Sequence, residues 1–155
     1  MNELVYRNLS EDAKRQICAW KYGGEYDLYN LPAYEEMQVR QIGFMNPKRE
    51  KNYYGFWDES ILVGFVNILE EKEEVFIGIG VNPDFCNKHY GQRMLLITYE
   101  ISKKLYPNKP LYLEVRTWNI RAVKCYQKAG FRIDGQAYEL TTEIGTGTFY
   151  RMIRE

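Results

Sequence analysis

Residues 75–81 read VFIGIGV, residues 91–105 read GQRMLLITYEISKKL, and residues 111–115 read LYLEV. The first and last of these stretches are short and β-rich, whereas the middle one repeats apolar residues at helical spacing. A strand, a helix and a second strand in this order form a βαβ unit, whose two strands are parallel. Ligands of such units bind at the carboxyl ends of the strands, near the start of the helix. The sequence therefore predicts a ligand site around residues 81–92.

The segments on either side of this unit predict a mixed-sheet α/β fold in a single domain over residues 1–155, because no repeat or linker divides the chain. Ahead of the unit, we expect a strand at 4–7, helices at 11–20 and 32–44, and strands at 52–57 and 61–69 that form a meander with 75–81. After it, we expect a helix at 119–129 and a closing pair of strands at 131–137 and 147–153. Residues 21–31 lack a regular period and predict an ordered loop.

Composition excludes several classes of protein. The 155 residues contain 21 Lys+Arg and 21 Asp+Glu, so a zero net charge gives no electrostatic footprint for nucleic acid or an anionic membrane. No apolar run approaches the ~20 residues that span a bilayer, and Met1–Leu4 lack the features of a secretory signal. Three cysteines without a Cys-x-x-Cys pair and a single histidine favour neither a disulfide framework nor a metal site. We therefore expect a cytoplasmic protein.

The segment Cys86-Asn87-Lys88-His89-Tyr90-Gly91-Gln92 connects the predicted strand to the predicted helix. Backbone N–H groups at a helix start are unpaired and favour a phosphate or pyrophosphate, to which Lys88 adds a cation. A single glycine is a weak indication, so this segment taken alone also fits an ordinary connecting loop.

A second group of residues follows the strand at 111–115. Asn119 heads the next predicted helix, Ala122 is small, and Tyr126 lies two turns after Asn119 on the same face. These three residues fit one edge of a ligand groove. They fit equally well an N-cap, a helix former and a buried tyrosine.

Taken together, these residues resemble the GCN5-related N-acetyltransferase (GNAT) family over residues 75–131. The most specific part is Leu113-Glu114-Val115, Asn119, Arg121-Ala122, Tyr126 and Lys128-Ala129-Gly130-Phe131. The resemblance implies a GNAT-like acyl-CoA N-acyltransferase fold, with a mostly antiparallel sheet and one parallel βαβ unit splayed around the co-substrate. It also implies an acetyl-CoA-dependent enzyme that acetylates a primary amine by direct attack in a ternary complex.

The family pattern assigns roles to individual residues. The backbone of Ile79, Gly80 and Val81 would bind the pantetheine arm, and Asn87, Lys88, His89, Tyr90, Gly91 and Gln92 would hold the pyrophosphate. Asn119 would contact the co-substrate beside the thioester, and Tyr126 would protonate the departing thiolate. The family loop reads Gln/Arg-x-x-Gly-x-Gly/Ala, so Cys86 and His89 depart from it and only Gly91 matches. This departure supports an alternative function, a non-catalytic acyl-CoA-binding or regulatory module.

Glu114 lies in a Leu-Glu-Val-Arg segment similar to that of family members that acetylate protein N-termini, in which the glutamate is proposed as the general base. It also fits a local pairing, for example with Arg116 on the same strand face. Residues 70–74, which are rich in glutamate, predict a solvated hairpin turn.

The acceptor side is expected in the segment that carries Tyr22, Tyr26 and Tyr29, together with Glu25 and Asp27. Aromatic faces and carboxylates attract ammonium groups, so these residues suit an amine that is a small molecule or is exposed on a protein or peptide. The same tyrosines also fit simple packing of the first helices on the sheet. Dimers are common in the family, so a homodimer is a further expectation.

Overall fold

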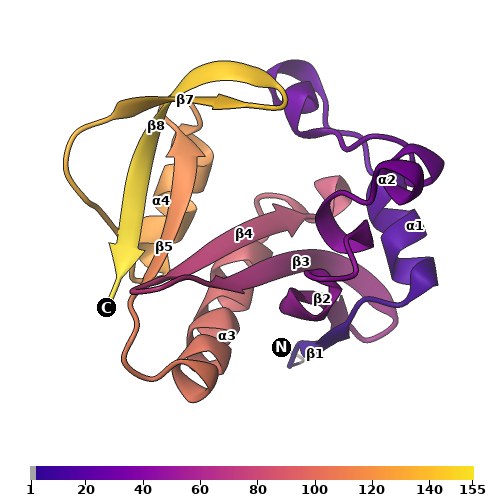
Figure 1. Cartoon of the computed structure of the whole chain (residues 1–155), viewed down its shortest axis with the longest axis horizontal. Coiled ribbons are helices and arrows are strands. Elements are labelled where there is room, and N and C mark those ends of the chain that lie inside the picture. Colours follow the sequence, from indigo (N-terminus) through magenta and orange to yellow (C-terminus); the bar gives the residue numbers. More distant parts are fainter. Residues whose placement is uncertain (1–2) are drawn as a thin grey trace. The chain divides into compact units, whose positions relative to one another are not determined.

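The structure is a computed structural model that describes residues 3–155 (Figure 1). Its strands and α-helices are β1 (Val5–Asn8), α1 (Glu11–Ala19), α2 (Tyr34–Arg40), β2 (Tyr53–Asp58), β3 (Ile61–Glu70), β4 (Val75–Val81), α3 (Tyr90–Leu105), β5 (Leu111–Arg116), α4 (Ile120–Lys128), β6 (Arg132–Ile133), β7 (Tyr138–Thr142) and β8 (Gly145–Arg154). Four short 3-10 helices complete the described part: η1 (Gly24–Tyr29), η2 (Gly43–Met45), η3 (Glu50–Asn52) and η4 (Pro83–Phe85).

The strands follow the order β1-β2-β3-β4-β5-β8-β6, and β7 also pairs with β8. β4 and β5 are parallel, whereas the pairs β1–β2, β2–β3, β5–β8, β6–β8 and β7–β8 are antiparallel. This confirms the predicted mixed sheet with one parallel βαβ unit. The parallel register joins Val75 to Leu111 and Phe76 to Tyr112, at the amino ends of both strands.

The chain forms two compact units. The first consists of the chain up to Asn67 together with Ile79–Tyr90, and the second consists of Ile68–Gly78 together with Gly91–Glu155. In the first unit, Ala13 and Ile17 of α1 pack into a buried cluster with Met37, Phe44 and other apolar side chains. Burial of this face, rather than helix propensity, stabilises such short helices.

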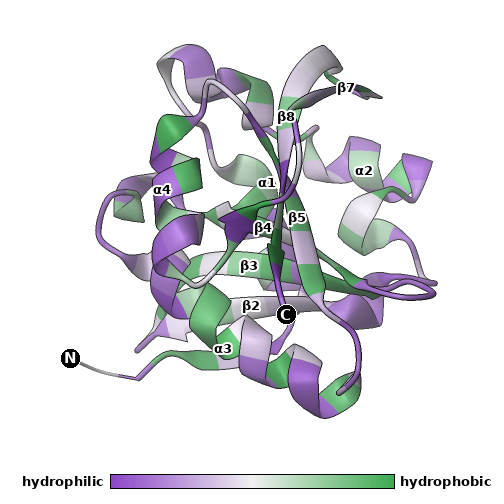
Figure 2. Ribbon diagram, turned by 90° about the vertical axis from the view of Figure 1, so that its left-hand side faces the viewer, coloured by the Kyte–Doolittle hydropathy of each residue, from purple (hydrophilic) through white to green (hydrophobic). Residues whose placement is uncertain are grey.

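In the second unit, alternate residues of β5 are buried, with Leu111 0%, Leu113 1% and Val115 4% exposed. The helical spacing of α3 predicts that Met94, Leu95 and Leu105 face inward. Met94 and Leu95 are fully buried, but Leu105 at the end of α3 is 51% exposed, so the prediction was wrong for Leu105. Both hydrophobic and hydrophilic residues occur around the turns of helices α3 and α4 (Figure 2).

Three segments differ from the predicted elements. The loop at 21–31 contains the 3-10 helix η1. The second helix ends at Arg40 rather than near residue 44, because Gln41 takes a left-handed conformation (φ 53°) and its N–H bonds to the carbonyl of Met37. The closing strand expected at 131–137 is only two residues long, and β7 forms a hairpin with β8 that the polar sequence YELTT did not reveal.

None of the helices in residues 3–155 is both long enough and apolar enough to cross a bilayer.

Gly80, near the end of β4, lies under the ring of Phe65 on β3. A Cβ at Gly80 would lie 2.9 Å from Phe65 Cζ and closer still to Cε1. The ring cannot easily move away, because it contacts the rings of Trp20, Phe44 and Tyr53, with centroids 6.1–6.4 Å apart. The absence of a side chain at Gly80 therefore lets β4 lie against the aromatic core.

We expect Gly80→Ala to lower the free energy of unfolding by about 1–3 kcal/mol, the usual effect of overpacking a filled core. Gly23→Ala is the control, because a Cβ at Gly23 would meet no atom within 4 Å. Denaturant unfolding measures both variants. Equal stability of the two would show that Phe65 moves aside without cost.

Candidate active site

The predicted pyrophosphate loop is a tight turn at residues 86–89 that leads into α3. Asn87 (φ 63°) and His89 (φ 67°) both take the left-handed conformation that favours glycine. Asparagine and histidine enter this region more readily than most side chains. The backbone therefore achieves here, without glycine, the conformation for which glycine is usually needed, and the departure at His89 leaves the turn intact.

Side chains of the first unit hold both ends of this loop. Asn82 accepts a hydrogen bond from the N–H of Asp84 and donates one to the carbonyl of Leu62, both at 3.0 Å. At the other end, the Tyr90 hydroxyl donates to a carboxylate oxygen of Asp58, the last residue of β2. The start of α3 is thereby fixed to the strands.

Lys88 lies beside Phe85, with its ammonium nitrogen 5.2 Å from the ring centroid. The Phe85 ring also meets the Tyr90 ring edge-on, with centroids 5.7 Å apart. These contacts give the loop a packed aromatic side and a cation at its surface. The binding of a phosphate by Asn87–Gln92 remains a prediction.

The carboxyl end of β4 is tied to the predicted acceptor segment. The Tyr22 hydroxyl donates to the carbonyl of Val81 at 2.6 Å, and the N–H of Tyr22 donates to Oδ1 of Asn30 at 2.6 Å. Because Tyr22 and Asn30 flank η1, these two bonds fix its position against the last residue of β4. One lone pair of the Val81 carbonyl is therefore engaged within the protein.

Within η1, Glu25 and Asp27 are exposed and Tyr26 and Tyr29 are half-buried. Aromatic and acidic residues on either side of η1 serve the scaffold. Trp20 packs against the core, the Tyr34 hydroxyl bonds to Glu11 at 3.0 Å, and Glu36 pairs with Arg40 at 2.9 Å. The predicted binding site for the acceptor amine is therefore restricted to the residues of η1.

In the second unit, Asn119 is the N-cap of α4. Its Oδ1 accepts the N–H of Ala122 at 3.2 Å, and the residue is 8% exposed. This confirms the N-cap interpretation, while a contact of Asn119 with the co-substrate remains a prediction. Tyr126 lies half-buried on the same helix.

Gly130 ends α4 as predicted, with φ 98°. A Cβ at Gly130 would lie 2.8 Å from Nε of Arg154, whose guanidinium also donates to the carbonyl of Ala129 at 3.0 Å. The turn after Tyr126 is therefore closed by β8, which supports the helix that carries the predicted acid.

Glu114 on β5 has a partner that the sequence did not suggest. The Tyr138 hydroxyl on β7 donates to Glu114 Oε2 at 2.8 Å. Burial, together with this hydrogen bond and the charge of Glu114, raises the pKa of Tyr138 well above its ordinary value. Arg116 instead lies over the Phe149 ring at 4.8 Å and donates weakly to Thr142 Oγ1 at 3.5 Å.

The glutamates that precede β4 form the predicted hairpin turn, and Glu70 and Glu73 are exposed, but three of the four also pair with other side chains. Glu74 makes a two-point ion pair with Arg151 on β8, with distances of 2.5 and 3.1 Å. Glu71 accepts the Tyr112 hydroxyl at 2.8 Å, and Glu70 pairs with Lys109 at 2.7 Å. Burial, followed by the hydrogen bond to Glu71, raises the pKa of Tyr112.

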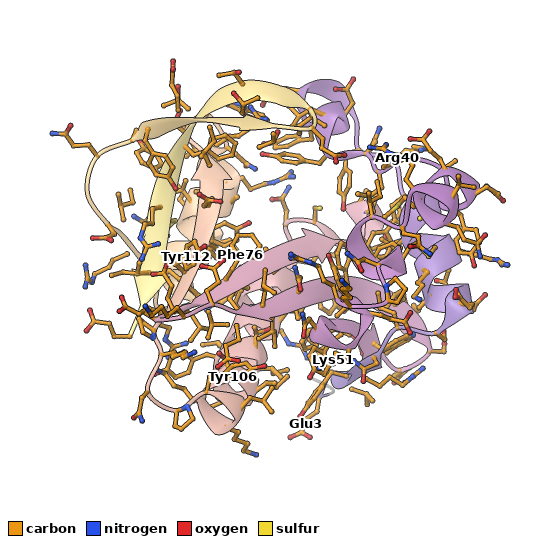
Figure 3. All side chains as sticks on the ribbon, in the orientation of Figure 1. Glu3, Arg40, Lys51, Phe76, Tyr106 and Tyr112 are labelled. Atoms are coloured by element: carbon orange, nitrogen blue, oxygen red, sulfur yellow. The ribbon has the colours of Figure 1, made fainter. Side chains whose placement is uncertain are left out.

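The same end of the strands has a tight aromatic contact. The rings of Phe76 and Tyr112, labelled in Figure 3, meet edge-on with centroids 5.5 Å apart. The guanidinium of Arg151 lies over the Tyr112 ring, 4.4 Å from the ring centroid. Charge pairing and aromatic packing together hold the beginnings of β4 and β5 against the carboxyl-terminal half of β8.

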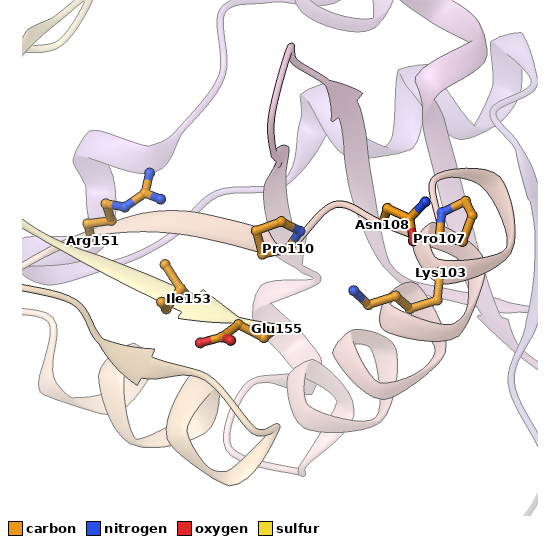
Figure 4. Close-up of a pocket in the computed structure, with 7 residues that line it drawn as sticks. All are labelled: Lys103, Pro107, Asn108, Pro110, Arg151, Ile153 and Glu155. Carbon is orange, nitrogen blue, oxygen red and sulfur yellow. The ribbon is translucent and has the colours of Figure 1, made fainter.

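A pocket of about 380 Å³ lies within the second unit and is lined by Lys103, Pro107, Asn108, Pro110, Arg151, Ile153 and Glu155 (Figure 4). Its charged groups already have partners. Lys103 donates to the carbonyl of Lys109 at 3.2 Å, Glu155 pairs with Arg132, and Arg151 pairs with Glu74. None of the predicted site residues lines this pocket, and we assign it no role.

Two residues of the site escaped sequence analysis: Asp58 and Tyr138. Each makes its contact with a residue 24 or more positions away in the chain. The only indication in the sequence is the total of 14 tyrosines, which have an apolar ring and a polar tip.

The sequence profile of the Acetyltransferase (GNAT) family matches residues 10–131, and the chain belongs to this family. Enzymes of this family acetylate amines with acetyl-CoA as co-substrate. The family assignment confirms the resemblance found in the sequence and the expected fold.

Individual relatives add detail. A probable spermine N(1)-acetyltransferase from Bacillus subtilis subsp. natto (strain BEST195) is 31% identical over 100 residues, 57% of this chain and 66% of that protein, which is just under two thirds of its length. The crystal structure of spermidine N-acetyltransferase from Vibrio cholerae in complex with CoA and spermine has a TM-score of 0.77 at 18% identity, covering 97% of this chain and 94% of that one. The structure of AAC(6')-Ib in complex with ribostamycin and coenzyme A has a TM-score of 0.75 at 16% identity, covering 99% and 93%. At such identities the likeness to the two structures shows a shared fold.

We expect His89→Val to lower the free energy of unfolding by about 1–2 kcal/mol, because a β-branched side chain is strained in the left-handed region. His89→Gly is the matched variant and should not show this loss. Chemical denaturation of the three proteins measures the difference. A Val variant as stable as the parent would mean that the loop adopts another conformation in solution.

Proposed function

We propose that this chain is an acetyl-CoA-dependent N-acetyltransferase whose acceptor is a linear polyamine of the spermine and spermidine class. The observation that carries the proposal is the hydrogen bond from the Tyr22 hydroxyl to the Val81 carbonyl. It fixes the acidic segment η1 against the carboxyl end of β4, where the family pattern places the reactive end of acetyl-CoA.

The charges of η1 suit a polycation. Glu25 and Asp27 are exposed, and within residues 3–155 neither carboxylate takes part in an ion pair. Two carboxylates on one turn would hold the distal ammonium groups of a polyamine while another nitrogen reacts. The half-buried rings of Tyr26 and Tyr29 add faces that attract ammonium groups. The polyamine acceptors named for the Bacillus and Vibrio relatives agree with this choice.

The reaction needs few groups. The acceptor ammonium loses a proton, for which Glu114 is the candidate base, and the neutral nitrogen attacks the thioester carbonyl. The C–S bond then breaks, and Tyr126 donates a proton to the departing thiolate. A second proton leaves the nitrogen as the amide forms and balances the one that Tyr126 gives. Positioning of the two substrates supplies much of the remaining rate.

The co-substrate would be held mainly by backbone. The turn at Asn87–His89, the start of α3 and the cation of Lys88 suit its pyrophosphate, because N–H groups at a helix start attract anions. The backbone of Ile79–Val81 suits the pantetheine arm. Asn119 would contact the co-substrate near the thioester while its Oδ1 caps α4.

We expect the double variant Glu25→Gln/Asp27→Asn to lower kcat/KM for spermine by about two- to fivefold per carboxylate, the range for exposed ion pairs. The reason is the loss of two attractive charges, so the difference should shrink as salt increases. Steady-state kinetics with spermine, spermidine and n-butylamine measure the effect, and the monoamine should be unaffected.

Glu100→Gln is the control for loss of an exposed carboxylate, because Glu100 lies on the outer face of α3. An unchanged kcat/KM for spermine in the double variant would exclude η1 as the acceptor site. Absence of CoA release from the parent with any polyamine, but turnover with ribostamycin or a peptide, would overturn the choice of acceptor.

We expect Tyr126→Phe to reduce kcat by about 10²–10⁴-fold, the usual contribution of a general acid. The affinity for acetyl-CoA should change little, because the ring still packs on α4. Single-turnover kinetics and an acetyl-CoA binding titration separate the two quantities. If the variant retains full turnover when chemistry limits the rate, Tyr126 is not the acid.

A further inference from the structure

Glu114 is held by a residue that no family pattern assigned. Tyr138 begins β7 and is paired with Phe149 on β8, and Phe149 is paired on its other edge with Arg116 of β5. β8 therefore lies between the strands that carry Tyr138 and Glu114. The tyrosine side chain is long enough to reach over β8, and its hydroxyl lies 2.8 Å from Glu114 Oε2.

We propose that Tyr138 is a positioning residue, whose hydroxyl holds the Glu114 carboxylate in the orientation in which it accepts the proton of the acceptor ammonium. This inference rests on the proposed function, in which Glu114 is the base. A hydrogen bond donated to a carboxylate is strong and directional. It restricts the rotation of a side chain that would otherwise sample several rotamers, and proton transfer depends on such alignment.

Tyr138 stays a donor under working conditions. Its burial, its hydrogen bond to Glu114 and the charge of Glu114 all raise its pKa, and the nearby Arg151 only partly opposes them. The phenol is therefore protonated throughout the range in which the enzyme would work. Tyr138 keeps its proton, and the proton taken from the ammonium goes to Glu114 and then to solvent.

The hairpin that carries Tyr138 is braced on β5 close to Glu114. Arg116 is 8% exposed, lies over the Phe149 ring and donates to Thr142 on β7. Gly147 makes this possible, because a Cβ there would overlap Arg116 Nη1 and would lie 3.0 Å from Cζ. The buried guanidinium thus ties β7 to β5 two residues from Glu114, so the position of Tyr138 is set by more than its own hydrogen bond.

The test compares two acceptors in Tyr138→Phe. An alkylammonium acceptor such as spermine needs a base, whereas an alkoxyamine is already neutral at the assay pH. We expect kcat for spermine to fall about tenfold or more, toward the range of a lost general base. We expect turnover of the alkoxyamine and KM for acetyl-CoA to stay within about twofold, because neither depends on removal of a proton from the amine.

A purely structural role would lower turnover of both acceptors equally, and that result would overturn the inference. Tyr99→Phe is the matched control, since it also removes one tyrosine hydroxyl bond in the second unit, the one to the carbonyl of Glu155 at 2.8 Å. This control variant should turn over both acceptors at the rates of the parent protein.

Glu114→Gln separates this inference from the proposed function. If Glu114→Gln loses activity with spermine and Tyr138→Phe has no effect, Tyr138 does not position the base, while Glu114 keeps its role. If Glu114→Gln retains full turnover, Glu114 is not the general base, and the inference that Tyr138 positions the base is also contradicted. In the Glu114→Gln background, we expect Tyr138→Phe to cause no further loss, and an additional loss of similar size would contradict the proposal.

Discussion

The ion pair between Glu74 and Arg151 is the interaction on which the second unit depends. It joins the residue before β4 to β8 through two N–H···O bonds, and Arg151 also bonds to Asp134 at 3.2 Å and covers the Tyr112 ring of β5. The hydrogen bond to Glu74 raises the already high pKa of Arg151, so its charge is constant. One guanidinium thereby fixes the beginnings of β4 and β5 to the carboxyl-terminal half of β8, and a planar fork suits this task better than an ammonium would.

The consequence is a parallel register that is anchored at its amino end. Val75 and Phe76 pair with Leu111 and Tyr112, and the N–H of Val75 bonds to the carbonyl of Pro110 at 2.9 Å. From this anchor, β4 runs on to Val81 and β5 to Arg116, where the proposed ligand-binding residues lie. These polar contacts fix the amino ends of the two strands, whereas ligands of βα units bind at the carboxyl ends.

Tyrosine hydroxyls then fix the functional segments within each unit. Tyr22 holds η1 on Val81, Tyr90 holds the start of α3 on Asp58, and Tyr138 holds Glu114. In each case the hydroxyl satisfies a carbonyl or carboxylate, which an aliphatic side chain cannot do. This use of a single side-chain type accounts for part of the high tyrosine content.

The sequence by itself determined the βαβ unit, the cap at Asn119, the stop at Gly130 and membership of the acetyltransferase family, because these depend on local periodicity, local hydrogen bonds and a specific motif. Tertiary structure alone decided the partners of Glu114, Glu74 and Val81, because these contacts join residues 24 to 77 positions apart. Tertiary structure also decided that His89, which stands where the family loop has glycine, adopts the left-handed conformation that glycine favours. The β7 strand was missed for the same physical reason. Its polar residues form a strand because they pair with the edge of β8. The sequence of β7 shows no alternation of apolar and polar residues from which this pairing could be predicted.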